Sequence, residues 1–375
     1  MNLNKQEINR YSRHIQLDEI GTAGQEKLKQ AKVLVIGAGG LGCPVLQYLT
    51  AAGVGSIGIV DFDVVEESNL QRQVLFNSNL IGRNKAHAAK EQLEKLNPFV
   101  KLIPYPIKLD YSNALSLFEQ YNLIVDATDN FESRYLISDA ALLSNKPIVF
   151  GAIHKFEGQV TVFNHNGGPT YRCLFPKHPK AASIPNCNEV GVVGVLPGIV
   201  GTYQANEVLK VLLRIGETLS GKLMLINTLS NSTSTIGINR NEQEIEKVLA
   251  QKNLSDQYAL SSETSIEEIS VAELKKRINQ GEYFDFLDVR EVHEQPKIEK
   301  LSGINLPIQK LKVNNNKILT NNTLISYCQT GIRSKKAIKY LQEEKGFTNI
   351  LNLQGGIQAW LQYETQEEQM ITKIS

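Results

Sequence analysis

The sequence lacks several features that would narrow its function at the outset. Its 375 residues contain no apolar run that approaches the roughly 18 residues of a membrane-spanning helix. The N-terminal stretch MNLNKQEINRYSRHI is polar and has no apolar signal core. The net charge is only +1, so bulk electrostatics predict neither nucleic-acid nor membrane-surface binding. We therefore expect a globular protein of the cytoplasm.

Cysteine is also scarce, and its spacing argues against two common uses. The four cysteines, Cys43, Cys173, Cys187 and Cys328, lie far apart in the chain. Because the cytoplasm is reducing, a disulfide framework is not expected. No CxxC pair exists, so a four-thiolate zinc site cannot be built within one chain. Each cysteine therefore needs its own interpretation.

The spacing of apolar residues predicts an α/β fold for the first part of the chain. Strand patterns cover residues 32–37, 56–63, 100–105, 122–129 and 146–152, and helix patterns cover 41–53, 85–98, 114–120 and 132–143. This alternation predicts right-handed βαβ units and therefore a parallel, doubly wound, Rossmann-like sheet.

After Gly151 the pattern changes. Residues 158–164 alternate as an antiparallel strand does, and residues 164–191 form a loop rich in Pro, Gly and Asn. A helix over 198–214 and a hairpin over 222–240 complete a first domain at 1–240.

The remaining chain predicts a linker and a second, smaller domain. Residues 241–265 are polar and are interpreted as a linker that is partly helical. A second α/β pattern covers 266–370, with its last helix at 355–362. About 105 residues are enough for a small independent domain.

A glycine-rich segment, GAGGLG, follows the first strand pattern and begins a helix. Gly37, Gly39, Gly40 and Gly42 allow a tight turn and a close approach of the backbone to a phosphate, and the helix N-terminus offers free N–H groups. Asp61 ends the second strand pattern, where it can accept hydrogen bonds from ribose hydroxyls. On these residues alone, an NAD-dependent oxidoreductase is the simplest interpretation.

Further polar and charged residues favour a triphosphate instead. They are Arg13, Asn69, Arg72, Gln73, Lys85, Asp129 and Asn130. A triphosphate carries about four negative charges, which Arg, Lys and a metal must neutralise during transfer. Arg13, Arg72, Lys85 and a divalent ion held by Asp129 would supply about five positive charges.

Eight motifs in one order and spacing then resemble the MoeB/ThiF family, bacterial relatives of the ubiquitin-activating E1 enzymes. They are RYSRH, VLVIGAGGLGCP, DFD, SNLQRQ, GRNKA, DATDNFESR, GQVTVF and CNEVGVVGVLPGIVG, and the resemblance covers residues 1 to about 238. It implies use of ATP and Mg²⁺ to adenylate the C-terminal glycine of a small ubiquitin-like sulfur carrier of the MoaD or ThiS type. It also implies a homodimer.

The same resemblance assigns roles to individual residues. Gly37, Gly39, Gly40 and Gly42 would form the nucleotide loop, and Asp61 would hold the ribose. The residues expected at the nucleotide phosphates are Asn69, Arg72, Gln73 and Lys85, with Asn130 beside them. Asp129 would hold the magnesium ion, and Arg13 would reach the phosphates from the second subunit.

The resemblance also bears on the cysteines. Many relatives bind a structural zinc through two CxxC pairs, but here the first reads Thr170-Tyr171-Arg172-Cys173 and no cysteine follows Asn227 before Cys328. We therefore expect no zinc and a buried, structural Cys173. Cys43 is expected to pack against the sheet. Cys187, in PNCNEVG, matches the family's crossover-loop cysteine and would form a thioester or resolve an acyl-disulfide.

Three motifs of the second domain, LDVRE, YCQTGIRS and LQGGIQAW, resemble a rhodanese domain. Cys328 ends a strand pattern and is followed by Gln329, Thr330, Gly331, Ile332 and Arg333 before a helix. Such a loop would curl around an exposed thiol and stabilise a persulfide with backbone N–H groups and the helix dipole. Asp288 and Arg290 are interpreted as a structural pair.

Together the two resemblances predict adenylation of a sulfur carrier followed by sulfur transfer from Cys328, in molybdopterin or thiamine biosynthesis. A persulfide donor such as a cysteine desulfurase would charge the thiol. Two alternatives stay open on the sequence: an NAD-dependent oxidoreductase with an accessory rhodanese domain, and a non-catalytic nucleotide sensor. Adenylation of a different acyl substrate is also compatible with the motifs.

Overall fold

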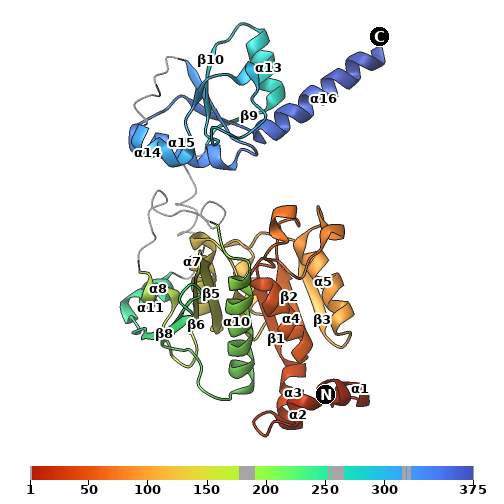
Figure 1. Cartoon of the computed structure of the whole chain (residues 1–375). Coiled ribbons are helices and arrows are strands. Elements are labelled where there is room, and N and C mark those ends of the chain that lie inside the picture. The colour runs from red at the N-terminus through yellow and green to blue at the C-terminus, as the bar shows by residue number, and fades with distance from the viewer. Residues whose placement is uncertain are drawn as a thin grey trace. The chain divides into compact units, whose positions relative to one another are not determined.

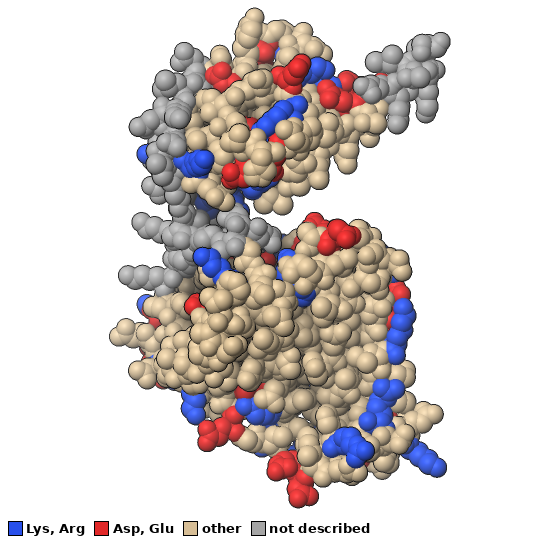
Figure 2. Space-filling model, in the orientation of Figure 1, with Lys and Arg blue, Asp and Glu red and all other residues tan. Residues whose placement is uncertain are grey.

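The computed structural model describes residues 2–176, 191–251, 254, 266–314, 318 and 322–374. The chain forms two compact units, which divide between Leu260 and Ser261 (Figure 1). Within the described residues, no helix has both the length and the hydropathy needed to cross a membrane. On the face drawn in Figure 2, basic and acidic side chains are interspersed within each unit.

The first unit is built on an eight-stranded sheet with the order β3-β2-β1-β4-β5-β6-β7-β8. Its strands are β1 (Lys32–Ile36), β2 (Ser56–Val60), β3 (Lys101–Tyr105), β4 (Leu123–Asp126), β5 (Ile148–His154), β6 (Glu157–Phe163), β7 (Lys222–Asn227) and β8 (Ser232–Gly237). The strands from β1 to β5 are parallel and the last three are antiparallel, which confirms the predicted doubly wound sheet and its change after Gly151.

Alternating residues of the central strand fill the two faces of this sheet. Val33 and Val35 pack under α3 (Gly21–Gln30), α4 (Gly42–Ala52), α5 (Lys85–Leu96) and α10 (Val195–Leu213). Leu34 and Ile36 pack under α6 (Ala114–Phe118) and α7 (Phe131–Leu143) on the other face. Because the chain turns to opposite sides from β1, the carboxyl ends of β1 and β4 flank the switch point where open α/β sheets bind ligands.

Two segments differ in detail from the sequence prediction. Helix α10 begins at Val195, three residues before the expected start. Residues 242–250 of the expected linker form α11 (Glu242–Ala250), whose Ile245 and Val248 are buried. Helix α11 packs on α7, although its polar composition resembles a linker. The boundaries of 1–240, 241–265 and 266–370 stay predictions.

The second unit has a five-stranded parallel sheet with the order β11-β10-β12-β13-β9. Its strands are β9 (Glu268–Ile269), β10 (Phe284–Asp288), β11 (Ile304–Asn305), β12 (Thr323–Tyr327) and β13 (Ile350–Leu353). Its helices are α13 (Val271–Asn279), α14 (Ile308–Asn314), α15 (Ile332–Lys345) and α16 (Gly356–Ile374). Separate cores lie on the two faces, which confirms a smaller α/β unit after the first.

Candidate functional sites

The glycine-rich loop connects β1 to α4 and is closed tightly on itself. Gly37 has φ +95°, and a Cβ there would lie 2.7 Å from the carbonyl oxygen of Ala127, which follows β4. A Cβ at Gly42 would overlap the carbonyl of Gly37. At Gly39, by contrast, the nearest atom is Gln73 Nε2 at 3.7 Å. The loop therefore has a compact base but leaves room for a Cβ at Gly39.

Asp61 follows β2 and fixes this loop. Its Oδ2 accepts a hydrogen bond from the backbone N–H of Ala38 at 2.8 Å, and its Oδ1 accepts one from Asp63 at 2.9 Å. Burial raises the pKa of Asp61, and the nearby Lys85 ammonium opposes that rise. Each oxygen keeps a second lone pair, so the carboxylate can still accept hydrogen bonds from a ligand hydroxyl.

Several predicted phosphate contacts lie near the loop. Lys85 is buried at the start of α5, and its Nζ lies 3.4 Å from Asp63 Oδ2. Asn69 and Gln73 are also buried, and Gln73 Oε1 has no hydrogen-bond partner in the described part of the chain. Arg72 Nη1 donates to the Ser68 carbonyl at 3.1 Å. A buried oxygen without a partner is costly, and this amide oxygen can only accept a hydrogen bond, so a ligand that satisfied it would have to offer a donor group.

The residues after β4 reach the same end of the sheet. Asp129 is exposed, and Asn130 is the N-cap of α7 and accepts a hydrogen bond from Ser133 N. Gly40 faces Pro197 near the start of α10 and lies close to Arg72, so α10 begins beside the loop. A single exposed carboxylate suits Mg²⁺, which binds through one or two carboxylates and the substrate phosphates.

Two buried residues near this site were not predicted. Burial raises the pKa of Asp126, whose Oδ1 accepts hydrogen bonds from Thr128 N at 3.0 Å and Thr128 Oγ1 at 2.7 Å. Arg134 donates to the Thr128 carbonyl, and its Nε has no partner among the described residues. The sequence feature that could have identified them is Asp126, an acid at the end of a buried strand pattern, followed by the segment FESR that contains Arg134.

Arg13 does not join these residues within one protomer. It lies in α2 (Ser12–Ile15), is exposed, and donates to Gln16 Oε1 at 3.1 Å. The N-terminal helices lie at the amino ends of the strands, where Gly55 N donates to the Leu28 carbonyl (Figure 1). The phosphate loop lies at the carboxyl ends. The expected role of Arg13 in a second subunit therefore stays a prediction.

The other cysteines of the first unit differ in their surroundings. Cys43 is fully buried in the core, as predicted, and burial raises its pKa to about 12. The prediction that Cys173 is buried was wrong. Cys173 is half-buried because it lies where α8 (Tyr171–Leu174) and α11 begin, and its Sγ accepts hydrogen bonds from Thr170 N and Asn241 N at 3.3 Å each. Cys187 lies outside the described residues.

Among the residues that the structure describes, no three His, Cys, Asp or Glu side chains gather in an arrangement that could hold a metal ion. The expected absence of zinc stays a prediction.

In the second unit, Cys328 follows β12 and is buried, so the expectation of an exposed thiol was wrong. Its carbonyl accepts a hydrogen bond from Ile357 N at 3.0 Å, which draws the start of α16 over the loop. Gly331, with φ +88°, precedes α15. Ser334 Oγ lies 3.6 Å from Cys328 Sγ, a contact that sequence reasoning missed.

The cations near Cys328 are paired. Arg333, the last residue of the predicted persulfide cradle, donates from both Nη atoms to Glu294 at 2.6 Å each. These hydrogen bonds lower the pKa of Glu294 to about 2. Arg290 is fully buried, and its Nη2 lies 2.9 Å from Asp288 Oδ2, which confirms the predicted structural pair. The cradle formed by Gln329, Thr330, Gly331, Ile332 and Arg333 stays a prediction.

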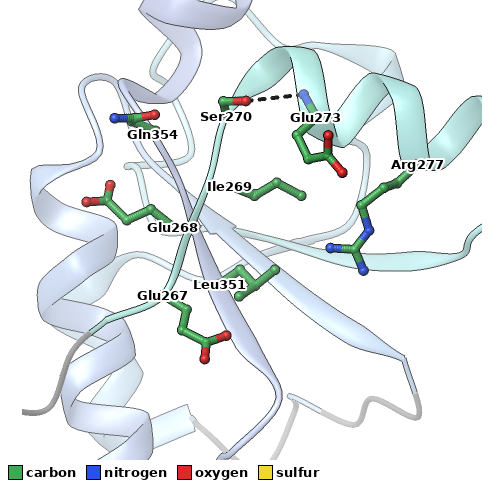
Figure 3. A pocket seen from close by; sticks show the side chains of 8 residues that line it. All are labelled: Glu267, Glu268, Ile269, Ser270, Glu273, Arg277, Leu351 and Gln354. Carbon is green, nitrogen blue, oxygen red and sulfur yellow. Dashed lines mark hydrogen bonds between the residues drawn. The ribbon is translucent and has the colours of Figure 1, made fainter.

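A hollow of about 570 Å³ lies on the second unit beside β9 (Figure 3). It is lined by Glu267, Glu268, Ile269, Ser270, Glu273, Arg277, Leu351 and Gln354. Neither Cys328 nor the glycine loop lines it. Its open, acidic lining does not suit a phosphate, so this hollow is not a candidate for the nucleotide site.

Comparison with family models covers both units. Residues 11–247 match the model of the ThiF family, and residues 270–363 match that of the Rhodanese-like domain.

Curated relatives span nearly the whole chain. A protein of Mycobacterium tuberculosis named probable adenylyltransferase/sulfurtransferase MoeZ is 41% identical over 372 residues, which cover 96% of this chain and 94% of that protein. Adenylyltransferase and sulfurtransferase MOCS3 of Xenopus laevis is 36% identical and covers 96% and 87%. A Thermus thermophilus protein named sulfur carrier protein adenylyltransferase is 52% identical over 246 residues, covering 64% and 91%.

Solved structures support the fold of the first unit. The crystal structure of E. coli MccB with ATP matches with a TM-score of 0.56 at 24% identity, over 64% of this chain and 73% of that one. At this identity the likeness concerns the fold alone.

Proposed function

The chain belongs to the ThiF family and carries a C-terminal rhodanese-like domain, and we propose that it activates a small sulfur carrier protein and transfers sulfur to it. It is an adenylyltransferase with sulfurtransferase activity, as its relatives over most of its length are named. This assignment replaces the oxidoreductase and nucleotide-sensor interpretations. A relative in Pyropia yezoensis is named probable molybdopterin-synthase adenylyltransferase, which supports molybdopterin synthesis as one pathway served.

One observation carries the adenylation step: a closed glycine loop with room at Gly39, where the nearest atom is the amide nitrogen of Gln73, a donor that can reach a phosphate. The carrier's C-terminal carboxylate attacks the α-phosphorus of ATP, which forms the acyl-adenylate and releases pyrophosphate. Lys85 and Arg72 would bind the phosphates, Asp61 the ribose, and Asp129 the Mg²⁺ that neutralises their charge.

Sulfur transfer would follow at Cys328. The terminal sulfur of a Cys328 persulfide attacks the acyl carbon, which expels AMP and leaves an acyl-disulfide. A second thiol, proposed to be Cys187, attacks Cys328 Sγ and releases the carrier thiocarboxylate. This step leaves a disulfide between the two cysteines, which a thiol reductant must reduce before the next cycle.

Two partners belong to this proposal. A persulfide donor of the cysteine-desulfurase class would recharge Cys328. A homodimer would bring Arg13 of a second copy to the phosphates, because Arg13 lies at the other end of the sheet from its own loop.

The deciding experiment measures pyrophosphate release with ATP, Mg²⁺ and a panel of carriers that end in Gly-Gly. Release should require both a carrier and Asp129, so Asp129→Ala should abolish it. Glu132→Ala is the matched control, because Glu132 is another exposed carboxylate at the start of α7. No release with any carrier, together with tight binding of NAD, would overturn the proposal.

A second measurement separates the two steps. Cys328→Ala should release pyrophosphate at the normal rate but form no thiocarboxylate from a persulfide donor. Normal thiocarboxylate formation by this variant would refute the role of Cys328.

A further inference from the structure

A line of polar side chains runs from Cys328 to the surface of the second unit. Ser334 Oγ lies 3.6 Å from Cys328 Sγ and 2.6 Å from Asn352 Oδ1. Asn352 Nδ2 in turn donates to Glu268 Oε2 at 2.9 Å. Ser334 and Asn352 are fully buried, so neither can exchange these partners for water. We call Ser334, Asn352 and Glu268 the relay.

Strand pairing brings the relay together. β13 pairs with β9 in parallel, and in this register Asn352 lies opposite Glu268. The Asn352 backbone N–H also donates to the Glu267 carbonyl at 2.8 Å, which holds the two strands in place. In Figure 3, Glu268 points to the other side of its strand from Ile269 and away from Arg277. The edge strand therefore places one carboxylate at the outer end of the relay.

The donors and acceptors of the relay fit in one direction only. A carboxylate accepts hydrogen bonds and cannot donate them. Partial burial alone would raise the pKa of Glu268, but hydrogen bonds from Lys335 and Asn352 outweigh burial and lower it. Glu268 is therefore charged at neutral pH and requires the NH₂ group of Asn352. The Asn352 carbonyl oxygen then faces Ser334.

Ser334 has one hydroxyl hydrogen and three acceptors within reach. Asn352 Oδ1 at 2.6 Å is nearer than the Gly331 carbonyl at 3.1 Å or Cys328 Sγ at 3.6 Å. With its hydrogen directed to Asn352, Ser334 presents a lone pair to Cys328. A lone pair accepts a hydrogen bond from the thiol S–H but repels a thiolate.

We propose that Glu268 and Asn352 are positioning residues that direct the Ser334 hydroxyl away from Cys328 and thereby withhold a hydrogen bond from its reactive sulfur. The inference rests on the proposed role of Cys328 as the sulfur-bearing residue. It adds that the reactivity of this thiol is set from the surface carboxylate of β9, through two buried side chains. A partner that withdrew or neutralised Glu268 would release the hydroxyl to stabilise the reactive anion.

Arg333 interacts with this thiol, and two further cations lie beside its loop or the relay, so all three must be held constant when the relay is changed. They are Arg333, paired with Glu294, Arg290, paired with Asp288, and Lys335, paired with Glu268. The relay variants leave the first two pairs in place.

The test reverses the relay with Glu268→Gln. The glutamine amide can donate to the Asn352 oxygen, so Asn352 can turn and donate its NH₂ to Ser334 Oγ. The Ser334 hydrogen is then free for the Gly331 carbonyl or for Cys328 Sγ, and an anionic sulfur is the stronger acceptor of the two. The rate at which iodoacetamide alkylates Cys328 is measured across pH from the mass of the peptide that contains it. The midpoint of this pH profile should lie about half to one pH unit lower in Glu268→Gln than in the unsubstituted protein. At neutral pH this corresponds to a three- to tenfold faster reaction.

Loss of the Glu268 charge could also favour the thiolate through space, and a double-mutant cycle separates the two causes. If the relay acts, Glu268→Gln has no effect on the midpoint in a Ser334→Ala background and regains its effect with Ser334→Thr, which keeps the hydroxyl. Glu268→Ala should shift the midpoint in the same direction by less, because it leaves Asn352 free to turn. Lys335→Gln, which changes charge without reversing the donors, should shift it little.

Two results would overturn the inference. One is an unchanged midpoint in both Glu268 variants. The other is a shift caused by Glu268→Gln that is equally large when Ser334 is present and in the Ser334→Ala background. The alkylation needs neither ATP nor a carrier, so its outcome is independent of pyrophosphate release. Failure of the relay would therefore be distinguishable from failure of the proposed function.

Discussion

The replacement of Gly37 by alanine tests whether the glycine loop binds ATP. Gly37 has φ +95°, a conformation that costs an L-residue about 1–2 kcal/mol. The new Cβ would lie 2.7 Å from the Ala127 carbonyl oxygen, roughly 0.7 Å short of ordinary contact. The loop must therefore move away from β4 or the variant must retain the strain.

A displacement of this size should be large in catalytic terms. Misplacement of a reacting group by about 1 Å can cost about 100-fold in rate. We expect Gly37→Ala to lower carrier-dependent pyrophosphate release by about 10- to 100-fold. Calorimetric titration with ATP and Mg²⁺ should show weaker binding, and the first unit should unfold at a lower temperature.

Gly39→Ala is the matched control for folding. Its Cβ would meet nothing closer than Gln73 Nε2 at 3.7 Å, and no positive φ opposes the change. The variant should fold with unchanged stability, yet bind ATP more weakly because the methyl group occupies space beside the phosphates. Wild-type ATP binding by both variants would refute the assignment of this loop.

Two further predictions concern the second unit, whose Trp360 is the only tryptophan of the chain and reports on its unfolding. Arg290→Met should lower the free energy of unfolding by up to about 3–5 kcal/mol, because the buried Asp288 carboxylate then keeps only Lys297 Nζ at 3.6 Å as a cationic partner. A loss below about 1 kcal/mol in urea titrations followed by fluorescence would contradict this. The hydrogen bonds from Arg333 lower the pKa of Glu294 from 4.5 to about 2, so this pair contributes stability above pH 4.5 that is lost as the pH falls toward 2. Glu294→Gln should remove that part of the acid dependence, and an unchanged profile between pH 4.5 and 2 would show that the pair contributes nothing.

The sequence predicted those features that depend on local patterns. The glycine loop was predictable because close contact of β1, α4 and the β4 loop excludes side chains at Gly37 and Gly42. The parallel, doubly wound sheet followed from the alternation of strand and helix patterns. Helix α11 was less clear, since only Ile245 and Val248 mark its buried face in a polar segment.

Features that depend on distant contacts were not predictable. The relay joins Asn352 to Glu268 across 84 residues, and no spacing in the sequence indicates which strands pair. The burial of Cys328 likewise depends on α16, whose Ile357 N–H donates to the Cys328 carbonyl. The loop motif identified the cysteine, but the surroundings of its thiol are set by tertiary contacts.

The two sites differ in how their polar groups are satisfied, and the difference fits their chemistry. Near the glycine loop, Gln73 Oε1 and Arg134 Nε are buried without partners among the described residues. Each such group costs about 1–3 kcal/mol, which a bound ligand can offset. Around Cys328, by contrast, Arg333 and Ser334 already have partners. A nucleotide site that its substrate completes can leave polar groups without hydrogen-bond partners in the protein. A nucleophilic thiol that must react only with its proper acceptor is better surrounded by groups that are already hydrogen-bonded.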